Sequence, residues 1–231
     1  MSQVKRYVLF ICGIFFMSLG ISCVIKSTLG TSPISSVPYV LSLRFPLSVG
    51  ETTFILNMGF LLGQIVVLGR RFQLLQLLQV PITVIFGFFI DLTMVMLHTV
   101  VPNNYGEQFV LMIAGAVLVA LGVALQIIGN VVTLAGEGVV KAIAIRWRYN
   151  FGTVKTCFDT SLVVIAIVLS CSYFGAVRGI REGTLISALI TGSISRFFIH
   201  RLSYRNGQGE PVFRFPFVGF ARTAEETDEG D

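Results

Sequence analysis

Six apolar stretches, each nearly free of charged residues, constrain this chain more than any other feature. They cover Tyr7–Ile25, Thr52–Gly69, Leu74–His98, Phe109–Gly129, Thr156–Ala176 and Thr184–His200. About 17–25 apolar residues are enough for a helix to cross a bilayer, and a helix satisfies its own backbone hydrogen bonds in lipid. The stretches are too long for the strands of an outer-membrane barrel, and they do not alternate as such strands do. The sequence therefore predicts an all-α membrane protein with six transmembrane helices.

The composition agrees with a chain that lies in a lipid bilayer. Only 13% of the residues are charged and 54% are hydrophobic, whereas a soluble domain carries about 25% charged residues. This balance excludes a disordered chain, a collagen-like chain and a nucleic-acid-binding module, so no nucleic-acid partner is expected. We expect a transmembrane domain over residues 1–202. The acidic end, Glu225–Asp231, indicates that residues 203–231 form a cytoplasmic, partly disordered tail.

The distribution of basic residues predicts the orientation of the chain. If the N-terminus is cytoplasmic, twelve Lys and Arg residues fall on the inner side and four on the outer side. Cytoplasmic loops of membrane proteins carry such an excess, so both termini are expected in the cytoplasm. The inner set is Lys5, Arg6, Arg70, Arg71, Lys141, Arg146, Arg148, Lys155, Arg201, Arg205, Arg214 and Arg222, and the outer set is Lys26, Arg44, Arg178 and Arg181.

The sequence repeats itself at an offset of about 102 residues. The matching blocks are Cys12–Ile21 with Ala114–Val123, Val49–Gly50 with Phe151–Gly152, and, after three extra residues in the second copy, Ile82–Gly87 with Ile186–Gly192. Each copy, about 7–98 and 109–200, holds three spans. An odd number of crossings forces the second copy to enter the membrane upside down. The fold is therefore predicted to be two inverted three-helix repeats, an arrangement that recurs in secondary transporters.

Each repeat also contains an irregular segment after its first span, too apolar for a plain loop and too short for a crossing. The two segments are Lys26–Arg44 and Gly129–Arg146. Ser32 followed by Pro33 is a typical helix start, with a hydroxyl N-cap and proline at the first helical position. In the second copy Gly136 precedes Glu137, and an apolar half-length stretch follows. We interpret both segments as re-entrant half-helices whose N-termini face each other and suit an anion or a carbonyl oxygen. The alternative is two interfacial helices that lie flat on the bilayer.

Four ionisable residues are expected within the membrane, where a charge at the centre costs about 2.5–3.5 kcal/mol. Asp159 follows Lys155 by one helical turn, a spacing that also fits a structural ion pair between the two. Glu137 could contact a ligand or stabilise a helix start. Asp91 and Arg196 occupy matching positions in the two repeats, and they are candidates for gating or proton coupling.

The candidate substrate-binding residues lie near the predicted meeting point of the two half-helices. They are Ser32, Pro33, Asn57, Gly136, Glu137 and Asp159. Further uncharged polar candidates for a cavity lining are Thr31, Ser35, Gln126, Asn130 and Thr133. Each of these side chains also fits a hydrogen bond between packed helices.

The sequence contains no enzyme motif. HExxH, GxSxG and GxxxxGK[ST] are all missing, and no histidine is spaced to serve a nucleophile. The four cysteines lie in apolar segments without metal-ligand spacing. We therefore expect no enzyme activity, no catalytic residue, no metal site and no cofactor.

Several short motifs, spread over roughly residues 7–200, carry a family resemblance. They are Leu29–Pro33, Gln76–Pro81, Phe86–Asp91, Ala135–Gly138, Phe151–Lys155 and Arg181–Thr184. With them the chain resembles the YczE/YyaS/YitT family of bacterial integral membrane proteins, in particular its smaller branch with a domain of unknown function. The resemblance implies a multi-pass protein of the bacterial inner membrane, and it implies little about activity.

Together these observations predict a small-solute transporter or permease with a midplane site between inverted repeats. Its partners would be the lipid bilayer and a small polar or anionic solute, and a homo-oligomer is compatible with the sequence. The alternative is a non-transporting accessory or scaffold protein. That alternative predicts no aqueous cavity between the repeats.

Overall fold

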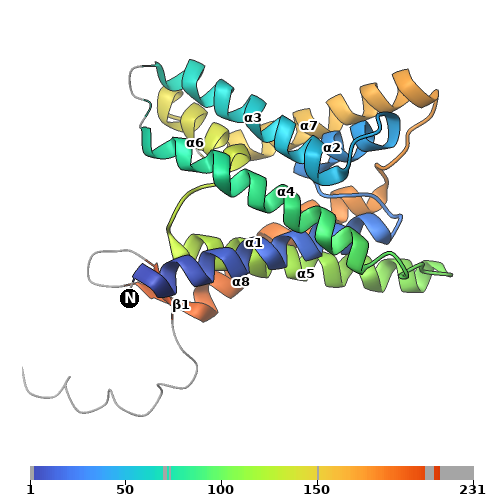
Figure 1. Cartoon of the computed structure of the whole chain (residues 1–231), viewed down its shortest axis with the longest axis horizontal. Coiled ribbons are helices and arrows are strands. Elements are labelled where there is room, and N and C mark those ends of the chain that lie inside the picture. Colours follow the sequence, from blue (N-terminus) through green and yellow to red (C-terminus); the bar gives the residue numbers. More distant parts are fainter. Residues whose placement is uncertain (1–2, 70–71, 73, 150, 206–210, 214–231) are drawn as a thin grey trace, which may run out of the picture.

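A computed structural model describes residues 3–69, 72, 74–149, 151–205 and 211–213 of the chain (Figure 1). The described part consists of helices and one pair of short strands. The elements are α1 (Gln3–Lys26), α2 (Pro33–Arg44), α3 (Val49–Leu68), the 3-10 helix η2 (Leu74–Leu78), α4 (Gln79–Met96), α5 (Tyr105–Gly129), α6 (Ala135–Trp147), α7 (Phe151–Phe174), α8 (Glu182–Leu202), β1 (Ser203–Arg205) and β2 (Pro211–Phe213).

Five of the described helices are long and apolar enough to cross a membrane. The five segments are Val4–Lys26, Val49–Leu68, Gln76–Met96, Tyr105–Gly129 and Thr153–Phe174. They coincide with five of the six predicted spans. The sixth prediction, Thr184–His200, falls within α8, which is helical but is not among the five. The reason lies in its sequence, because α8 contains Glu182, Arg196 and Arg201 together with several Ser and Thr residues.

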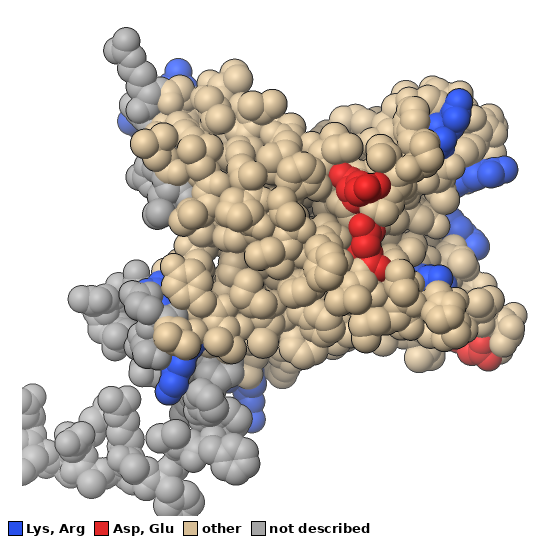
Figure 2. Space-filling view, in the orientation of Figure 1, with Lys and Arg blue, Asp and Glu red and all other residues tan. Residues whose placement is uncertain are grey.

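Figure 2 shows a broad surface band that suits a lipid environment. On this face the Lys and Arg side chains gather at the two ends of the long axis. The band between them is largely uncharged, apart from acidic side chains grouped in one part of it. Many large apolar side chains are exposed along the helices, including Val66, Phe88, Val110 and Val168. Exposed apolar surface on this scale is typical of contact with a membrane. The protein is thus a membrane-type helical protein.

The centre of the molecule is the pair formed by α1 and α5, which run antiparallel along most of their length (Figure 1). Gly13 lies against Gly122, and Gly20 lies against Gly115. A Cβ atom at any of these four positions would fall within 2.6–2.9 Å of the facing carbonyl oxygen. Small residues allow such close backbone approach between membrane helices. These glycines are therefore required by the geometry of the helix pair.

Arg6 closes one end of the α1–α5 pair. Its Nε donates to the carbonyl of Gly129 at 3.1 Å, and its Nη2 donates to the carbonyl of Asn130 at 2.9 Å. These carbonyls belong to the C-terminal end of α5, where Asn130 adopts a left-handed conformation at the cap. A cation that satisfies the last carbonyls stabilises a helix end. The start of α1 and the end of α5 therefore lie at the same end of the molecule.

The remaining helices form two groups, one packed directly on this pair and one to one side of it (Figure 1). Helix α4 packs on α1, and α8 packs on α5. In the second group α2 packs on α7 and α3 packs on α6, while α4 also contacts α3 and so joins the groups. The largest cluster of buried apolar side chains lies mainly between α1, α4 and α5 and includes Phe10, Ile14, Phe86, Ile90 and Val119.

The end of the described chain forms a small antiparallel pair of strands. Ser203 pairs with Phe213 and Arg205 pairs with Pro211. The all-α expectation therefore applies to the helical domain and not to these two segments. The rest of the predicted tail, residues 206–210 and 214–231, lies outside the described residues.

Candidate functional site

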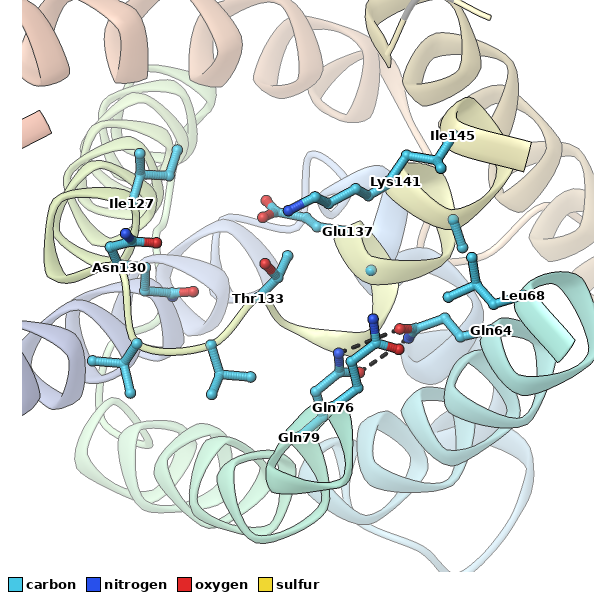
Figure 3. Close-up of a pocket in the computed structure, with 15 residues that line it drawn as sticks. Gln64, Leu68, Gln76, Gln79, Ile127, Asn130, Thr133, Glu137, Lys141 and Ile145 are labelled. Carbon is cyan, nitrogen blue, oxygen red and sulfur yellow. Dashed lines mark hydrogen bonds between the residues drawn. The ribbon is translucent and has the colours of Figure 1, made fainter. Parts of the chain in front are cut away.

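A cavity of about 380 Å³ opens where the ends of α3 and α5 meet the starts of α4 and α6 (Figure 3). Polar side chains form much of its wall, although it lies among apolar helices. Its described lining consists of Gln64, Leu68, Gln76, Gln79, Gln126, Ile127, Asn130, Val131, Val132, Thr133, Glu137, Gly138, Lys141, Ala142 and Ile145.

Two buried glutamines hold the first turn of α6 in place. Gln64 and Gln79 are 1% and 3% exposed, and their side-chain amides exchange hydrogen bonds of 3.0 and 3.3 Å. The Nε2 atom of Gln64 also donates to the carbonyl of Ala135 at 3.0 Å. Gly138 fits beside this amide, because a Cβ there would lie 2.6 Å from Oε1 of Gln64. Buried amides need such partners, so these two side chains build one wall of the cavity.

Other polar groups on the lining have no protein partner. The Oε1 atom of Gln76 is buried and accepts no hydrogen bond from the described residues. The side chains of Asn130 and Thr133 line the same cavity, and Figure 3 shows Thr133 pointing into it. A buried polar atom without a partner is costly. An unpartnered amide oxygen at a cavity wall therefore indicates a place for water or a polar solute.

One acid and one base also line the cavity, and both come from α6. Glu137 lies in the first turn and Lys141 one turn later, and Figure 3 shows both side chains extending into the cavity. Both residues are described, and no ion pair joins them. Glu137 is also close enough to Lys155 and Asp159 to interact with them electrostatically. Those two residues pair with each other, with 2.8 Å between Nζ of Lys155 and Oδ1 of Asp159.

The structure brings the two half-length helices together at their N-terminal turns. Helix α2 begins at Pro33 with Ser32 at the N-cap, as its sequence predicts. Ser32 does not cap the backbone with its side chain, and its Oγ instead donates to Oγ of Ser35 at 2.9 Å. The side chain of Ile34 lies directly over Gly136, where a Cβ atom would collide with it. The first turns of α2 and α6 are therefore in contact.

The predicted site residues separate into those near the cavity and those away from it. Glu137 lines the cavity, and Gly136 precedes it, covered by Ile34. Asp159 lies beside this region and forms an ion pair with Lys155. This ion pair is the structural role that the sequence left open beside a role in substrate binding. Asn57 is buried and donates to the carbonyl of Thr53 at 2.8 Å, within its own helix.

Asp91 lies at a different place, where α4 meets the start of α3. Its Oδ1 accepts from the backbone N–H of Gly50 at 2.8 Å, and its Oδ2 accepts from Oγ of Ser48 at 2.7 Å. A carboxylate in this position satisfies the free N–H groups at a helix N-terminus. Arg196 belongs to α8, and only its backbone is described.

Four polar or charged residues of the described lining escaped prediction from the sequence, namely Gln64, Gln76, Gln79 and Lys141. A signal existed for the glutamines, since polar amides within or beside apolar spans usually contact other polar groups. Lys141 was counted only as a basic residue of the inner side. The predicted lining candidates Gln126, Asn130 and Thr133 do lie on this cavity.

A family of unknown function, DUF6198, matches residues 4–200. The chain belongs to this family. The match covers all helices that build the cavity, so the cavity is part of the DUF6198 domain. The assignment agrees with the resemblance carried by the sequence motifs.

Among individual proteins, this DUF6198 member is similar to "Uncharacterized protein YyaS" of Bacillus subtilis (strain 168). The two are 32% identical over 123 residues, which is 53% of this chain and 60% of the relative. The match thus spans less than two thirds of that relative's length. No solved structure matches the chain.

Proposed function

We propose that this protein is a small-solute transporter and that the cavity is its substrate site. The observation that carries the proposal is a polar cavity, with unpartnered amide and charged groups, among helices long enough to span a membrane. Its volume of about 380 Å³ lies within the range of small-molecule sites, roughly 300–1,000 Å³. Ionisable residues at membrane depth commonly mark a solute or ion pathway.

Two inverted repeats of three spans are part of the proposal, with α8 as the sixth span and α2 and α6 as half-helices. The contacts of the glycines in the α1–α5 pair support this arrangement. By the sequence offset, Gly13 corresponds to Gly115 and Gly20 to Gly122. Because Gly13 contacts Gly122 and Gly20 contacts Gly115, each contact is the two-fold counterpart of the other. Such reciprocal contacts are expected at an isologous interface.

Two pairs of helix contacts follow the same two-fold relation, whereas the contact of α3 with α4 has no counterpart of similar extent between α7 and α8 among the described residues. The contact of α1 with α4 corresponds to that of α5 with α8, and the contact of α2 with α7 corresponds to that of α6 with α3. Substrate sites of inverted-repeat transporters lie at the repeat interface, beside broken or half-length helices. The cavity, next to the contact between the first turns of α2 and α6, has this location.

The cavity faces the cytoplasm in the proposed orientation. It is built from the end of α3, the start of α4 and the end of α5, which lie at the same end of the molecule as Arg6. The excess of basic residues on the predicted inner side supports a cytoplasmic location for that end. The structure would then correspond to an inward-facing state of a protein in the inner membrane.

At the opposite end, which faces the outside in the proposed orientation, hydrogen bonds join the two proposed repeats. The backbone N–H of Gly183 donates to the carbonyl of Leu29 at 2.9 Å, and that of Thr31 donates to Oγ1 of Thr184 at 3.2 Å. Gly30 makes this approach with a φ of +129°, a conformation that favours glycine. A transporter with alternating access opens on one side at a time, so such contacts on the outer side agree with the proposal.

Uptake into proteoliposomes tests the proposal directly. The purified protein should accumulate at least one labelled solute from a panel of amino acids, sugars, carboxylates and amines. Thr133→Trp, which fills the cavity, should abolish that uptake. Val66→Trp places the same side chain at a site that is 82% exposed on α3, and it should leave uptake unchanged. Equal uptake by both variants, or no uptake of any solute, would count against the transporter and favour the accessory protein.

Cysteine labelling tests the side on which the cavity opens. The background carries replacements of the four native cysteines, Cys12, Cys23, Cys157 and Cys171. A membrane-impermeant maleimide should label Thr133→Cys in inside-out vesicles and not in right-side-out vesicles. Thr184→Val removes an outer hydrogen bond and should increase labelling of Ser32→Cys from outside. Labelling of Thr133→Cys from the outside alone would contradict the proposed orientation.

A further inference from the structure

The charged groups of the cavity point to the class of solute. Its described lining contains one carboxylate, on Glu137, and one ammonium group, on Lys141. From this pair we infer that the cavity binds a small zwitterion of amino-acid size, with Glu137 facing the ammonium group of the solute and Lys141 facing its carboxylate. The inference deepens the proposed function and rests on it.

The spacing of the two charges suits a bridging solute. Residues four apart on a helix have Cβ atoms roughly 5–6 Å apart, and a Glu followed by a Lys at that spacing is a favourable order for an ion pair. Both residues are described, yet no ion pair or hydrogen bond joins them, and Figure 3 shows both side chains extending into the cavity. The nearby Lys155 and Asp159 neutralise each other. Glu137 and Lys141 therefore have no hydrogen-bonded or ion-paired partner among the described residues, and each can bind a solute group of opposite sign.

A solute with a single charge fits this lining less well. A simple carboxylate would satisfy Lys141 but would bring a negative charge close to Glu137. A simple amine would satisfy Glu137 and repel Lys141. Discrimination of this kind depends on unfavourable contacts with the wrong solute. The cost of a charge without a partner is greatest for the partly buried Glu137. A zwitterion satisfies both groups and leaves the net charge of the site unchanged.

The uncharged part of the lining suits the rest of such a solute. The amide oxygen of Gln76 is an unused acceptor, and Asn130 and Thr133 offer both donors and acceptors. Ile127, on α5, and Ile145, on α6, supply apolar surface on two sides of the cavity (Figure 3). The site can therefore hold a short carbon skeleton with a polar end, which is the form of a small amino acid.

Binding to the purified full-length protein in detergent micelles tests the inference. The probes are the twenty standard L-amino acids, followed by matched analogues of the amino acid that binds most tightly, one without the ammonium group and one without the carboxylate. We expect at least one amino acid to bind, with at least tenfold higher affinity than either analogue. Failure of all twenty to bind, or an analogue that binds as tightly as its parent, would overturn the inference.

Variants assign the two charges to the two solute groups. Glu137→Gln and Lys141→Gln should each weaken binding of the amino acid at least tenfold. Glu137→Gln should affect the analogue without an ammonium group much less, and Lys141→Gln should affect the analogue without a carboxylate much less. Arg146→Gln is the matched control, because Arg146 is an exposed residue of the same helix outside the cavity lining. Wild-type affinity in both cavity variants would overturn the assignment.

The outcomes separate this inference from the transporter itself. Uptake of a sugar or a singly charged solute, blocked by Thr133→Trp, would support transport and overturn the zwitterion inference. Amino-acid binding that depends on both charges, without uptake of any solute, would support the binding site and overturn the transporter.

Discussion

Replacing Gly20 by valine is expected to separate α1 from α5 and to give the largest loss of stability of any single change considered. A Cβ at this position would lie 2.6 Å from both the carbonyl oxygen of Gly115 and the backbone nitrogen of Val119. Backbone atoms in a helix cannot move aside as a flexible side chain can. Overpacking usually costs about 1–3 kcal/mol, and we expect the upper end of that range or more. Thermal unfolding followed by size-exclusion chromatography in detergent measures the effect.

The matched control for this change is Gly59→Val. Gly59 also lies within a span, in α3, but a Cβ there would meet no atom within 4 Å. Its unfolding midpoint should stay close to that of the wild type. If both valine variants unfolded at the same temperature, the close contact between α1 and α5 would be wrong.

Replacing Asp91 by alanine is expected to destabilise the junction of α3 and α4. The carboxylate accepts two hydrogen bonds, from the backbone of Gly50 and the hydroxyl of Ser48. Hydrogen bonds to charged groups contribute about 1.5–3 kcal/mol each, and the start of α3 also loses a favourable charge. We expect a loss of about 3 kcal/mol in the free energy of unfolding, measured by denaturant titration in micelles.

Two further variants identify the cause of that loss. Asp91→Asn keeps an acceptor for Gly50 and should lose less stability than the alanine variant. Glu51 caps the same helix from an exposed position, with Oε2 accepting from the backbone of Ser48 at 2.8 Å, so Glu51→Gln should lose less than about 1 kcal/mol. Wild-type stability in Asp91→Ala, together with an altered pH dependence of uptake, would instead favour the proton-coupling role suggested by the sequence.

The helices of this protein could be predicted from the sequence because lipid imposes a simple rule. A chain in hydrocarbon must satisfy its backbone within each segment, so long apolar stretches become helices, and five of the six predicted stretches are candidate spans. The start of α2 could also be predicted, because proline at the first helical position, here Pro33, is a local signal for the start of a helix. Local rules also explain the ion pair of Lys155 with Asp159, one turn apart.

The cavity could not be predicted in the same way, because it depends on which helices meet. Gln64 and Gln79 look like isolated polar residues in separate spans until the fold places their amides in contact. Lys141 looked like one more basic residue of the inner side, and only the position of α6 turns it toward the cavity. Asp91 had no visible partner, since Ser48 and Gly50 precede it by about forty residues. Distances between spans are not encoded in any local pattern.

The pairing of α1 with α5 also determines when the protein can assemble during synthesis. The residues that cover the glycines of α1, Gly115 and Gly122, are made about a hundred residues later. Until then the first helix lacks the neighbour that fits it most closely, and contacts between distant parts of a chain form late. The first half of the chain therefore cannot complete the packing of α1 by itself. A chain truncated after the third span would lack α5. We expect such a fragment to fold unstably and to be degraded.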